Sequence, residues 1–237
     1  MNGKKDGVLM TCYACLLVIG GLLTWLKYDY NAVKMEDVRE ACGYVSASAT
    51  PVEAPKIALT FDDGPSAAWT PALLDGVKER GVKATFFLIG ENADKNPEIV
   101  KRMAEEGHLI GNHTYHHVEL TKVSENEARL ELADTSAVIV RITGKEPEYM
   151  RPPFGAWQRK LEQEIQMLPV LWTIDPLDWT TENQDEIVNK VVTEAEENDI
   201  ILLHDCYKSS IEAGLRIVDI LQEEGFVFVT VDELLLN

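Results

Sequence analysis

Seven short runs rich in β-branched and aromatic residues recur from residue 56 onwards, and segments with helical periodicity separate them. This alternation predicts strands joined by crossover helices, and therefore a parallel sheet. Seven such units predict an α/β fold, a parallel (β/α)7-type barrel whose sheet need not close fully. The expected strands are residues 56–61, 83–89, 108–112, 148–152, 169–174, 199–204 and 226–230, and the clearest helical patterns are 71–80, 97–106, 124–142 and 184–197.

The segment 8–26 contains no charged residue and is rich in Leu, Val, Ile and Gly. A helix of this length would extend about 28 Å at about 1.5 Å per residue, which matches the roughly 30 Å of hydrocarbon in a bilayer. Lys4 and Lys5 precede the segment and Lys27 follows it. The charges therefore predict a cytoplasmic tail (1–7), a transmembrane anchor (8–26) and an extracytoplasmic remainder. A cleaved signal peptide is the alternative interpretation.

Residues 27–55 end in a stretch rich in Ser, Ala and Pro, which is typical of a linker. The linker would join the anchor to one domain at 56–237. The sequence therefore predicts a single-pass protein of the cell membrane whose domain lies outside the cytoplasm.

Two of the four cysteines, Cys12 and Cys15, lie in the predicted anchor, where membrane packing explains them better than a metal or redox pair. Cys42 and Cys206 would both lie in an oxidising compartment. A disulfide between these two cysteines is one possibility, and two free thiols are the other.

The formal net charge is −18, and the first 50 residues hold five basic and five acidic side chains. The whole excess of negative charge therefore falls on the predicted domain. Such a domain repels nucleic acids at long range, and the sequence has no basic patch with interleaved aromatic residues. These features exclude a nucleic-acid-binding protein and favour neutral or cationic substrates.

Side chains suited to catalysis or metal binding cluster where five of the expected strands end. Because parallel strands of a βα barrel end on the same side, these side chains are predicted to meet on the functional face of the fold. Asp62 and Asp63 follow the first strand, His113 and His117 the third, Arg151 ends the fourth, Asp175 and Asp178 follow the fifth, and His204 ends the sixth.

The two acidic residues and the two histidines predict a metal site. His113 and His117 are four residues apart, so one helical turn would bring both imidazoles to the same side. Two His and one Asp leave coordination positions free for water and substrate, as a catalytic metal site requires. A turn without further function is the alternative interpretation of Asp62-Asp63 before Gly64-Pro65.

The motifs that carry these residues resemble, in order and spacing, the five motifs of the polysaccharide deacetylases, carbohydrate esterase family 4. The resemblance covers about residues 56–235. It implies a distorted (β/α) barrel that removes N-acetyl, and sometimes O-acetyl, groups from polysaccharides with a divalent metal, usually zinc or cobalt. The matching motifs are Thr60-Phe61-Asp62-Asp63-Gly64-Pro65, His113-Thr114-x-x-His117, Arg151-Pro152-Pro153-Phe154-Gly155, Asp175-x-x-Asp178-Trp179 and Leu202-x-His204.

The resemblance implies a role for each matching residue. Asp63, His113 and His117 would be the metal ligands. Asp62 would be the general base that acts on the hydrolytic water at the metal. Arg151 would orient the Asp62 carboxylate and hold it ionised, because a fixed positive charge favours the charged form of a neighbouring acid.

The remaining motif residues would serve the leaving group, the oxyanion and the acetyl group. His204 would be the general acid that protonates the departing amine, and Asp178 would hold His204 in the competent tautomer. The backbone N–H of Phe154, together with the metal, would stabilise the oxyanion. The substrate-binding residues would be Trp179, Leu202 and Pro153.

Together these expectations describe a metal-dependent, monomeric, membrane-anchored N-deacetylase of cell-wall glycan, with N-acetylglucosamine of peptidoglycan as its substrate and Zn as its metal, Co being possible. Three other substrates remain open, namely a chitin-like polymer, an exported poly-N-acetylglucosamine and O-acetylated xylan. An inactive glycan-binding module of the cell wall is the alternative from a different class.

Overall fold

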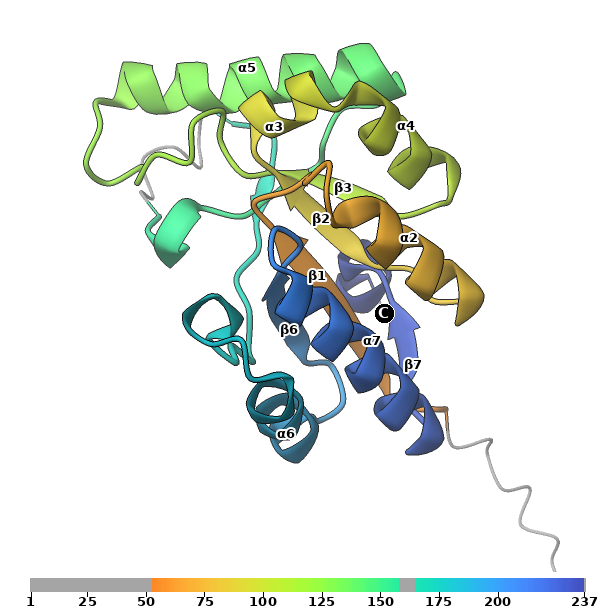
Figure 1. Ribbon diagram of the computed structural model, residues 1–237. Helices are drawn as coiled ribbons and strands as arrows, with labels where there is room; N and C mark the ends of the chain where they lie inside the picture. The colour runs from red at the N-terminus through yellow and green to blue at the C-terminus, as the bar shows by residue number, and fades with distance from the viewer. Residues whose placement is uncertain (1–52, 158–164, 237) are drawn as a thin grey trace, which may run out of the picture. The chain divides into compact units, whose positions relative to one another are not determined.

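A computed structural model describes residues 53–157 and 165–236 (Figure 1). The chain divides into two units, 1–53 and 54–237, and the second contains nearly all of the described residues. The predicted tail and anchor, all but the end of the predicted linker, and Cys42 with its possible disulfide lie outside the described residues. Within the described ranges, no helix combines the length and the apolar composition needed to cross a membrane.

A parallel sheet of seven strands forms the centre of the second unit, in the order β5-β4-β3-β2-β1-β6, with β7 also paired to β1. The sheet is curled and helices cover its outside (Figure 1). This confirms the predicted barrel-like α/β architecture. The strands are β1 (Lys56–Asp62), β2 (Thr85–Leu88), β3 (Leu109–Asn112), β4 (Tyr149–Met150), β5 (Leu168–Pro169), β6 (Ile200–His204) and β7 (Val227–Val229).

Within the described residues, four α-helices match the four predicted patterns to within three residues at each end, and three further α-helices accompany them. The matching helices are α2 (Thr70–Glu79), α4 (Pro97–Glu105), α5 (Glu125–Thr143) and α6 (Gln184–Glu194); the others are α3 (Gly90–Lys95), α7 (Lys208–Glu223) and α8 (Val231–Leu235). Local signals set the ends of α5. The Ser124 side chain accepts the N–H of Glu127, and Gly144 ends the helix with a φ of 75°.

Strand β1 is buried on both faces, as its nearly continuous apolar sequence predicts for a central parallel strand. Ile57, Leu59 and Phe61 pack in the main core with residues of the surrounding helices. Ala58 belongs to a second cluster with Phe87 of β2, which lies on the opposite face of the sheet. Thr60 and Asp62 follow Ala58 at alternate positions, so the strand carries the Asp62 carboxylate to the end of that opposite face.

The predicted strand at 169–174 is wrong beyond Pro169, because β5 contains only Leu168 and Pro169. The carbonyl oxygens of Val170 and Leu171 accept hydrogen bonds from the Arg151 guanidinium, each at 3.2 Å, in place of a strand partner. Farther along, Ile174 forms an isolated parallel bridge to Ile201 of β6. This bridge and the hydrogen bonds between Thr173 and Ile200 link the segment after β5 to β6.

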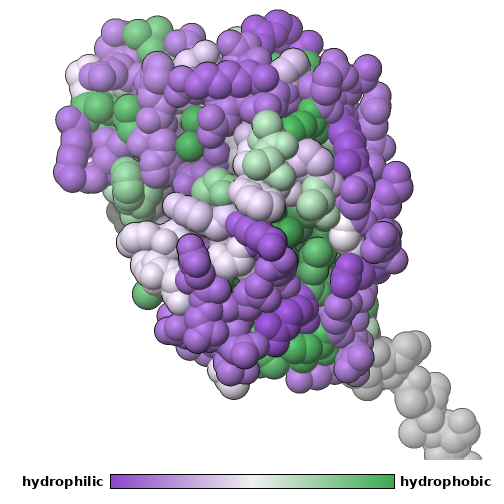
Figure 2. Space-filling model, in the orientation of Figure 1, coloured by the Kyte–Doolittle hydropathy of each residue, from purple (hydrophilic) through white to green (hydrophobic). Residues whose placement is uncertain are grey.

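The surface agrees with the acidic composition. Figure 2 shows that the visible face is mainly hydrophilic, and that its hydrophobic residues form small separate areas. Ion pairs such as Arg80 with Asp219 and Arg102 with Asp75 lie at the surface, where each contributes little to stability.

His108 is a buried histidine immediately before β3, and its burial predicts a pH-dependent stability. Its Nδ1 accepts the N–H of Ala84 at 3.1 Å. Burial, helped by the charge of Lys83, lowers the pKa of His108 to about 4. The unfolded chain therefore binds the proton that the folded chain excludes between about pH 6.5 and pH 4, and stability falls as the pH falls through this window.

The expected loss from His108 is about 2 kcal/mol in the free energy of unfolding between pH 7 and pH 5. Urea unfolding at both pH values should reveal the loss in the wild type. In His108→Gln, which keeps an acceptor for the Ala84 N–H but does not titrate, the difference between the two pH values should be smaller by that amount. Equal pH dependence in the two proteins would contradict the assignment.

Candidate active site

The carboxyl ends of the strands surround a pocket of about 430 Å³. The pocket draws residues from segments that are far apart in the sequence. Its lining consists of Asp62, Asp63, His113, His117, Phe154, Trp172, Asp175, Leu177, Trp179, Leu202, His204 and Tyr207. The prediction that strand-end motifs meet on one face therefore agrees with the arrangement of these side chains.

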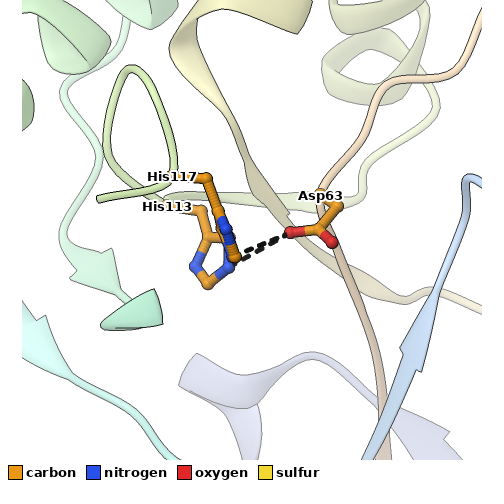
Figure 3. Close-up of side chains that lie close together, drawn as sticks. All are labelled: Asp63, His113 and His117. Atoms are coloured by element: carbon orange, nitrogen blue, oxygen red, sulfur yellow. Dashed lines mark ion pairs between the residues drawn. The ribbon is translucent and has the colours of Figure 1, made fainter. Parts of the chain in front are cut away.

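Asp63, His113 and His117 converge on one point, from the loop after β1 and the loop after β3 (Figure 3). Asp63 Oδ1 lies 3.4 Å from Nε2 of His113 and 3.3 Å from Nε2 of His117. Two ligands of one zinc ion at about 2.0–2.1 Å in tetrahedral geometry are separated by about 3.4 Å. The spacing of the three donor atoms therefore fits a single divalent metal.

The hydrogen bonds around these donors also fit a metal. His113 Nδ1 donates to the backbone carbonyl of Arg151 at 2.7 Å, which leaves the lone pair on Nε2, the atom that faces Asp63. Asp63 Oδ1 is buried and has no hydrogen-bond partner among the described residues. Burial by itself raises the pKa of Asp63, but the contacts with His113 and His117 outweigh it and lower the pKa, so the carboxylate is ionised and suited to bind a cation.

The two histidines do not converge through a helical turn, so that part of the prediction is wrong. Residues 113–117 form a loop in which Thr114 has a φ of 63° and His117 a φ of 56°. A right-handed helix cannot contain these backbone angles. The ring centroids of His113 and His117 nevertheless lie 4.9 Å apart, because the loop folds back on itself.

Asp62 is buried beside the three donors, and the guanidinium of Arg151 binds one of its carboxylate oxygens. Nη1 of Arg151 donates to Asp62 Oδ1 at 2.8 Å and to Thr60 Oγ1 at 2.7 Å. The other carboxylate oxygen, Asp62 Oδ2, lies 3.8 Å from Nε2 of His113. One oxygen of Asp62 is therefore fixed by a charge pair, and the other faces the point where the three donors meet.

His204 lies on another wall of the pocket and is paired with Asp178. Asp178 accepts the backbone N–H of His204 through Oδ2 and the ring Nδ1–H through Oδ1, each at 2.8 Å. Burial by itself lowers the pKa of His204, but this hydrogen bond and the negative charges of Asp178, Asp62 and Asp63 outweigh it and raise the pKa to about 9. His204 is therefore protonated near neutral pH, and its Nε2 side is the one available to the pocket.

A family model described as polysaccharide deacetylase matches residues 49–171. The chain belongs to the polysaccharide deacetylase family. A peptidoglycan-N-acetylglucosamine deacetylase of Bacillus cereus is 42% identical to it over 194 residues, which are 79% of this chain and 70% of that protein. The corresponding PgdA of Listeria monocytogenes is 38% identical over 210 residues, which are 85% of this chain and 45% of that protein.

Among solved structures, the peptidoglycan deacetylase PdaC from Bacillus subtilis superposes with a TM-score of 0.75 at 39% identity, covering 77% of this chain and 90% of that one. The chain is thus a deacetylase of carbohydrate esterase family 4, a family that hydrolyses the amide bond of N-acetyl groups and depends on a divalent metal. The family match and the fit of the three donor atoms point to the same kind of centre.

The structure places the other predicted residues of this deacetylase at different depths. Phe154, Trp179 and Leu202 line the pocket, whereas Arg151 and Asp178 lie behind the residues they contact. Pro153 is buried and does not line the pocket, so the structure gives no support for its predicted contact with substrate.

Three residues of the pocket wall, Trp172, Leu177 and Tyr207, are absent from the site predicted from sequence, because the sequence predicts a strand at 169–174 and no role for Leu177 or Tyr207. Tyr207, at the rim, follows the histidine motif closely enough to be noticed from sequence. Asp175 lines the pocket, and its Oδ1 also accepts the N–H of Leu177 at 2.8 Å. This hydrogen bond shapes the turn and gives Asp175 a structural role.

Unusual backbone angles cluster around the site. Of the six non-glycine residues with positive φ among the described residues, all but Asn198 belong to the pocket or the loops that form it. Such conformations persist only where the surroundings enforce them, and they are common at functional sites. The five are Asp63, Thr114, His117, Phe154 and Leu177.

Proposed function

We propose that this protein is a peptidoglycan N-acetylglucosamine deacetylase that uses a divalent metal, most simply Zn, held by Asp63, His113 and His117. The observation that carries the proposal is the convergence of three metal-binding atoms, a buried carboxylate and a protonated imidazole on one pocket. The substrate is inferred from the similar proteins of Bacillus cereus and Listeria monocytogenes, whose names specify peptidoglycan N-acetylglucosamine.

A bound metal would polarise the acetyl carbonyl and lower the pKa of the hydrolytic water. Asp62 takes a proton from that water through the oxygen that Arg151 does not hold. The pairing of Oδ1 with Arg151 fixes the orientation of the carboxylate. Asp62 is buried and its free oxygen faces the point where the proposed metal ligands meet, so the carboxylate is placed to act as the general base.

His204 donates a proton to the amine nitrogen as the C–N bond breaks, so that the products are acetate and a free amine. Asp178 holds the His204 ring through Nδ1, which leaves the proton on Nε2 to face the leaving group. The backbone N–H of Phe154 is proposed to stabilise the oxyanion. Trp179 and Leu202 are proposed to enclose the acetyl methyl group.

A second groove favours a polymeric substrate over a small one. This groove, of about 500 Å³, lies between the loop of η3 (Asp178–Thr180) and the start of α7. It shares Trp179 and Tyr207 with the active-site pocket, so the two hollows adjoin at these residues. Both aromatic side chains are partly exposed and suited to packing against sugar rings.

We further propose that segment 8–26 anchors a monomer in the cell membrane and that the linker lets the catalytic domain reach the wall. Protease digestion of intact cells that express the protein would test this arrangement. Accessibility of the domain only after the membrane is opened would contradict it.

Acetate release by the purified, Zn-loaded protein tests the proposed function. Peptidoglycan and N-acetylglucosamine oligomers are the two substrates, and Asp62→Asn is the control. Release from peptidoglycan that disappears in the control supports the proposal. Release from oligomers alone would retain the chemistry and reject the wall substrate. No release from either, with metal bound, would favour the inactive glycan-binding module.

Replacing Asp178 with Asn is expected to move the alkaline limb of the kcat profile to lower pH. Activity requires protonated His204, so it falls as the pH rises through the pKa of that residue. Removal of the Asp178 charge lowers this pKa, by about 1–3 units for a charge in hydrogen-bond contact. Measurement of kcat between pH 6 and pH 10 should show the shift, whereas Asp175→Asn, which removes a nearby charge that does not contact His204, should shift it much less.

A further inference from the structure

The loop that carries His113 and His117 is attached to the two helices that flank it. On one side, the N–H groups of Gly90 and Glu91 in α3 donate to the carbonyls of Thr114 and Tyr115 at 2.9 and 3.1 Å. On the other side, hydrogen bonds that involve side chains connect the loop to α5. The loop needs this support, because the left-handed conformation at Thr114 is unfavourable for a β-branched residue.

Asn112 provides one side-chain attachment. Its Oδ1 accepts the N–H of Thr114 at 2.9 Å, and its Nδ2 donates to the carbonyl of Leu132 at 2.8 Å and to Ser136 Oγ at 3.0 Å. The start of the loop is therefore tied to the middle of α5.

Glu131 of α5 provides the second attachment and is 8% exposed. Its Oε2 accepts the N–H of Tyr115 at 2.9 Å and the N–H of His116 at 2.7 Å. Its Oε1 accepts the ring Nδ1–H of His116 at 2.8 Å. A buried carboxylate with three donors is held rigidly, and its hydrogen bonds are stronger than those of a neutral acceptor.

We propose that Glu131 is a positioning residue for the metal centre, and that it acts by fixing two of the four peptide groups between His113 and His117. The inference rests on the proposed metal function. With the two N–H groups held on one oxygen, the chain is forced to reverse, and both Nε2 atoms come within 3.4 Å of Asp63 Oδ1. Without Glu131 this part of the loop is less constrained, and the two imidazoles are held less firmly at the spacing that one metal requires.

A different explanation is that Glu131 only neutralises His116, whose side chain is exposed on the outer face of the loop. The two explanations differ in which atoms matter. If the backbone contacts matter, Glu131→Gln keeps the site, because the amide oxygen still accepts both N–H groups. His116→Ala also keeps it, because the main-chain contacts of Glu131 remain.

The test measures Zn²⁺ affinity by competition with a chromogenic chelator, together with the visible absorption spectrum of the Co²⁺-loaded protein, on the full chain. Glu131→Ala and Glu131→Asp should weaken Zn²⁺ binding by about 10- to 100-fold and change the Co²⁺ bands, as loss of an outer contact to a metal site does. Glu131→Gln and His116→Ala should retain the affinity and spectrum of the wild type. If Glu131→Ala does not fold, the contrast between Glu131→Asp and Glu131→Gln decides.

Val138→Ala is the matched control, because it removes buried methyl groups from the same helix at a side chain that cannot form a hydrogen bond to the loop. It should lower stability and leave Zn²⁺ affinity unchanged. Wild-type affinity in Glu131→Ala, or an equal loss in Val138→Ala, would overturn the inference while the proposed function stood. Absence of Zn²⁺ binding by the wild type would overturn both.

Discussion

Replacing Asp62 with Asn is expected to lower kcat for acetate release by about 10²- to 10⁴-fold, the range that a general base contributes. The substitution keeps the shape of the side chain and removes its ability to accept a proton. Asp62 Oδ2 faces the point where Asp63, His113 and His117 meet, while Oδ1 is held by Arg151. No other described carboxylate in the pocket has this placement, since Asp63 belongs to the metal-binding set and Asp175 shapes a turn.

The adjacent substitution Asp63→Asn is the matched control for Asp62→Asn. Both changes replace a carboxylate by an amide in the same turn, but the two positions have different predicted tasks. Asp62→Asn should retain Zn²⁺ with little change in affinity, whereas Asp63→Asn should lose both affinity and activity. An Asp62→Asn protein with activity within tenfold of the wild type would show that another group accepts the proton.

The fold was predictable from sequence where burial is continuous. Strand β1 begins at the predicted residue, and β6 ends at the predicted residue, because central parallel strands are apolar on both faces and bounded by polar residues. The prediction of a strand at 169–174 is wrong because of a long-range contact, which a local sequence pattern cannot reveal. The carbonyls of Val170 and Leu171 are used by Arg151, which lies about twenty residues earlier in the chain.

The membership of the candidate site was predictable from topology, since residues that end parallel strands must gather at one side of the sheet. The way in which the two histidines converge was not predictable, because their spacing of four residues also fits a helical turn. The structure uses a loop fixed by Glu131 instead. One signal was present in the sequence, because Glu131 lies on the buried face of α5 between Ala128 and Thr135. A charged residue on the apolar face of a helix needs a partner.

Arg151→Met is expected to cost about 3–5 kcal/mol in the free energy of unfolding of the metal-free protein, the range for breaking a buried charge pair. Arg151 is 0% exposed, and its guanidinium donates to Asp62, to Thr60 and to two backbone carbonyls. The guanidinium carbon also lies 4.2 Å from the centroid of the Phe87 ring. Met fills much of the same volume but leaves the Asp62 carboxylate buried without a counter-charge.

Most of that cost should come from the unpaired carboxylate, so the double variant Arg151→Met with Asp62→Asn should be more stable than the sum of the two single effects predicts. A coupling of about 1–3 kcal/mol is expected for charges in direct contact. Urea unfolding of the wild type, the two single variants and the double variant gives the coupling energy. As a control, Arg80→Met breaks the exposed pair with Asp219 and should cost less than about 1 kcal/mol in the free energy of unfolding. Additive effects at Arg151 and Asp62 would mean that Arg151 stabilises the fold through its carbonyl and ring contacts. A different contact would then have to orient the Asp62 carboxylate.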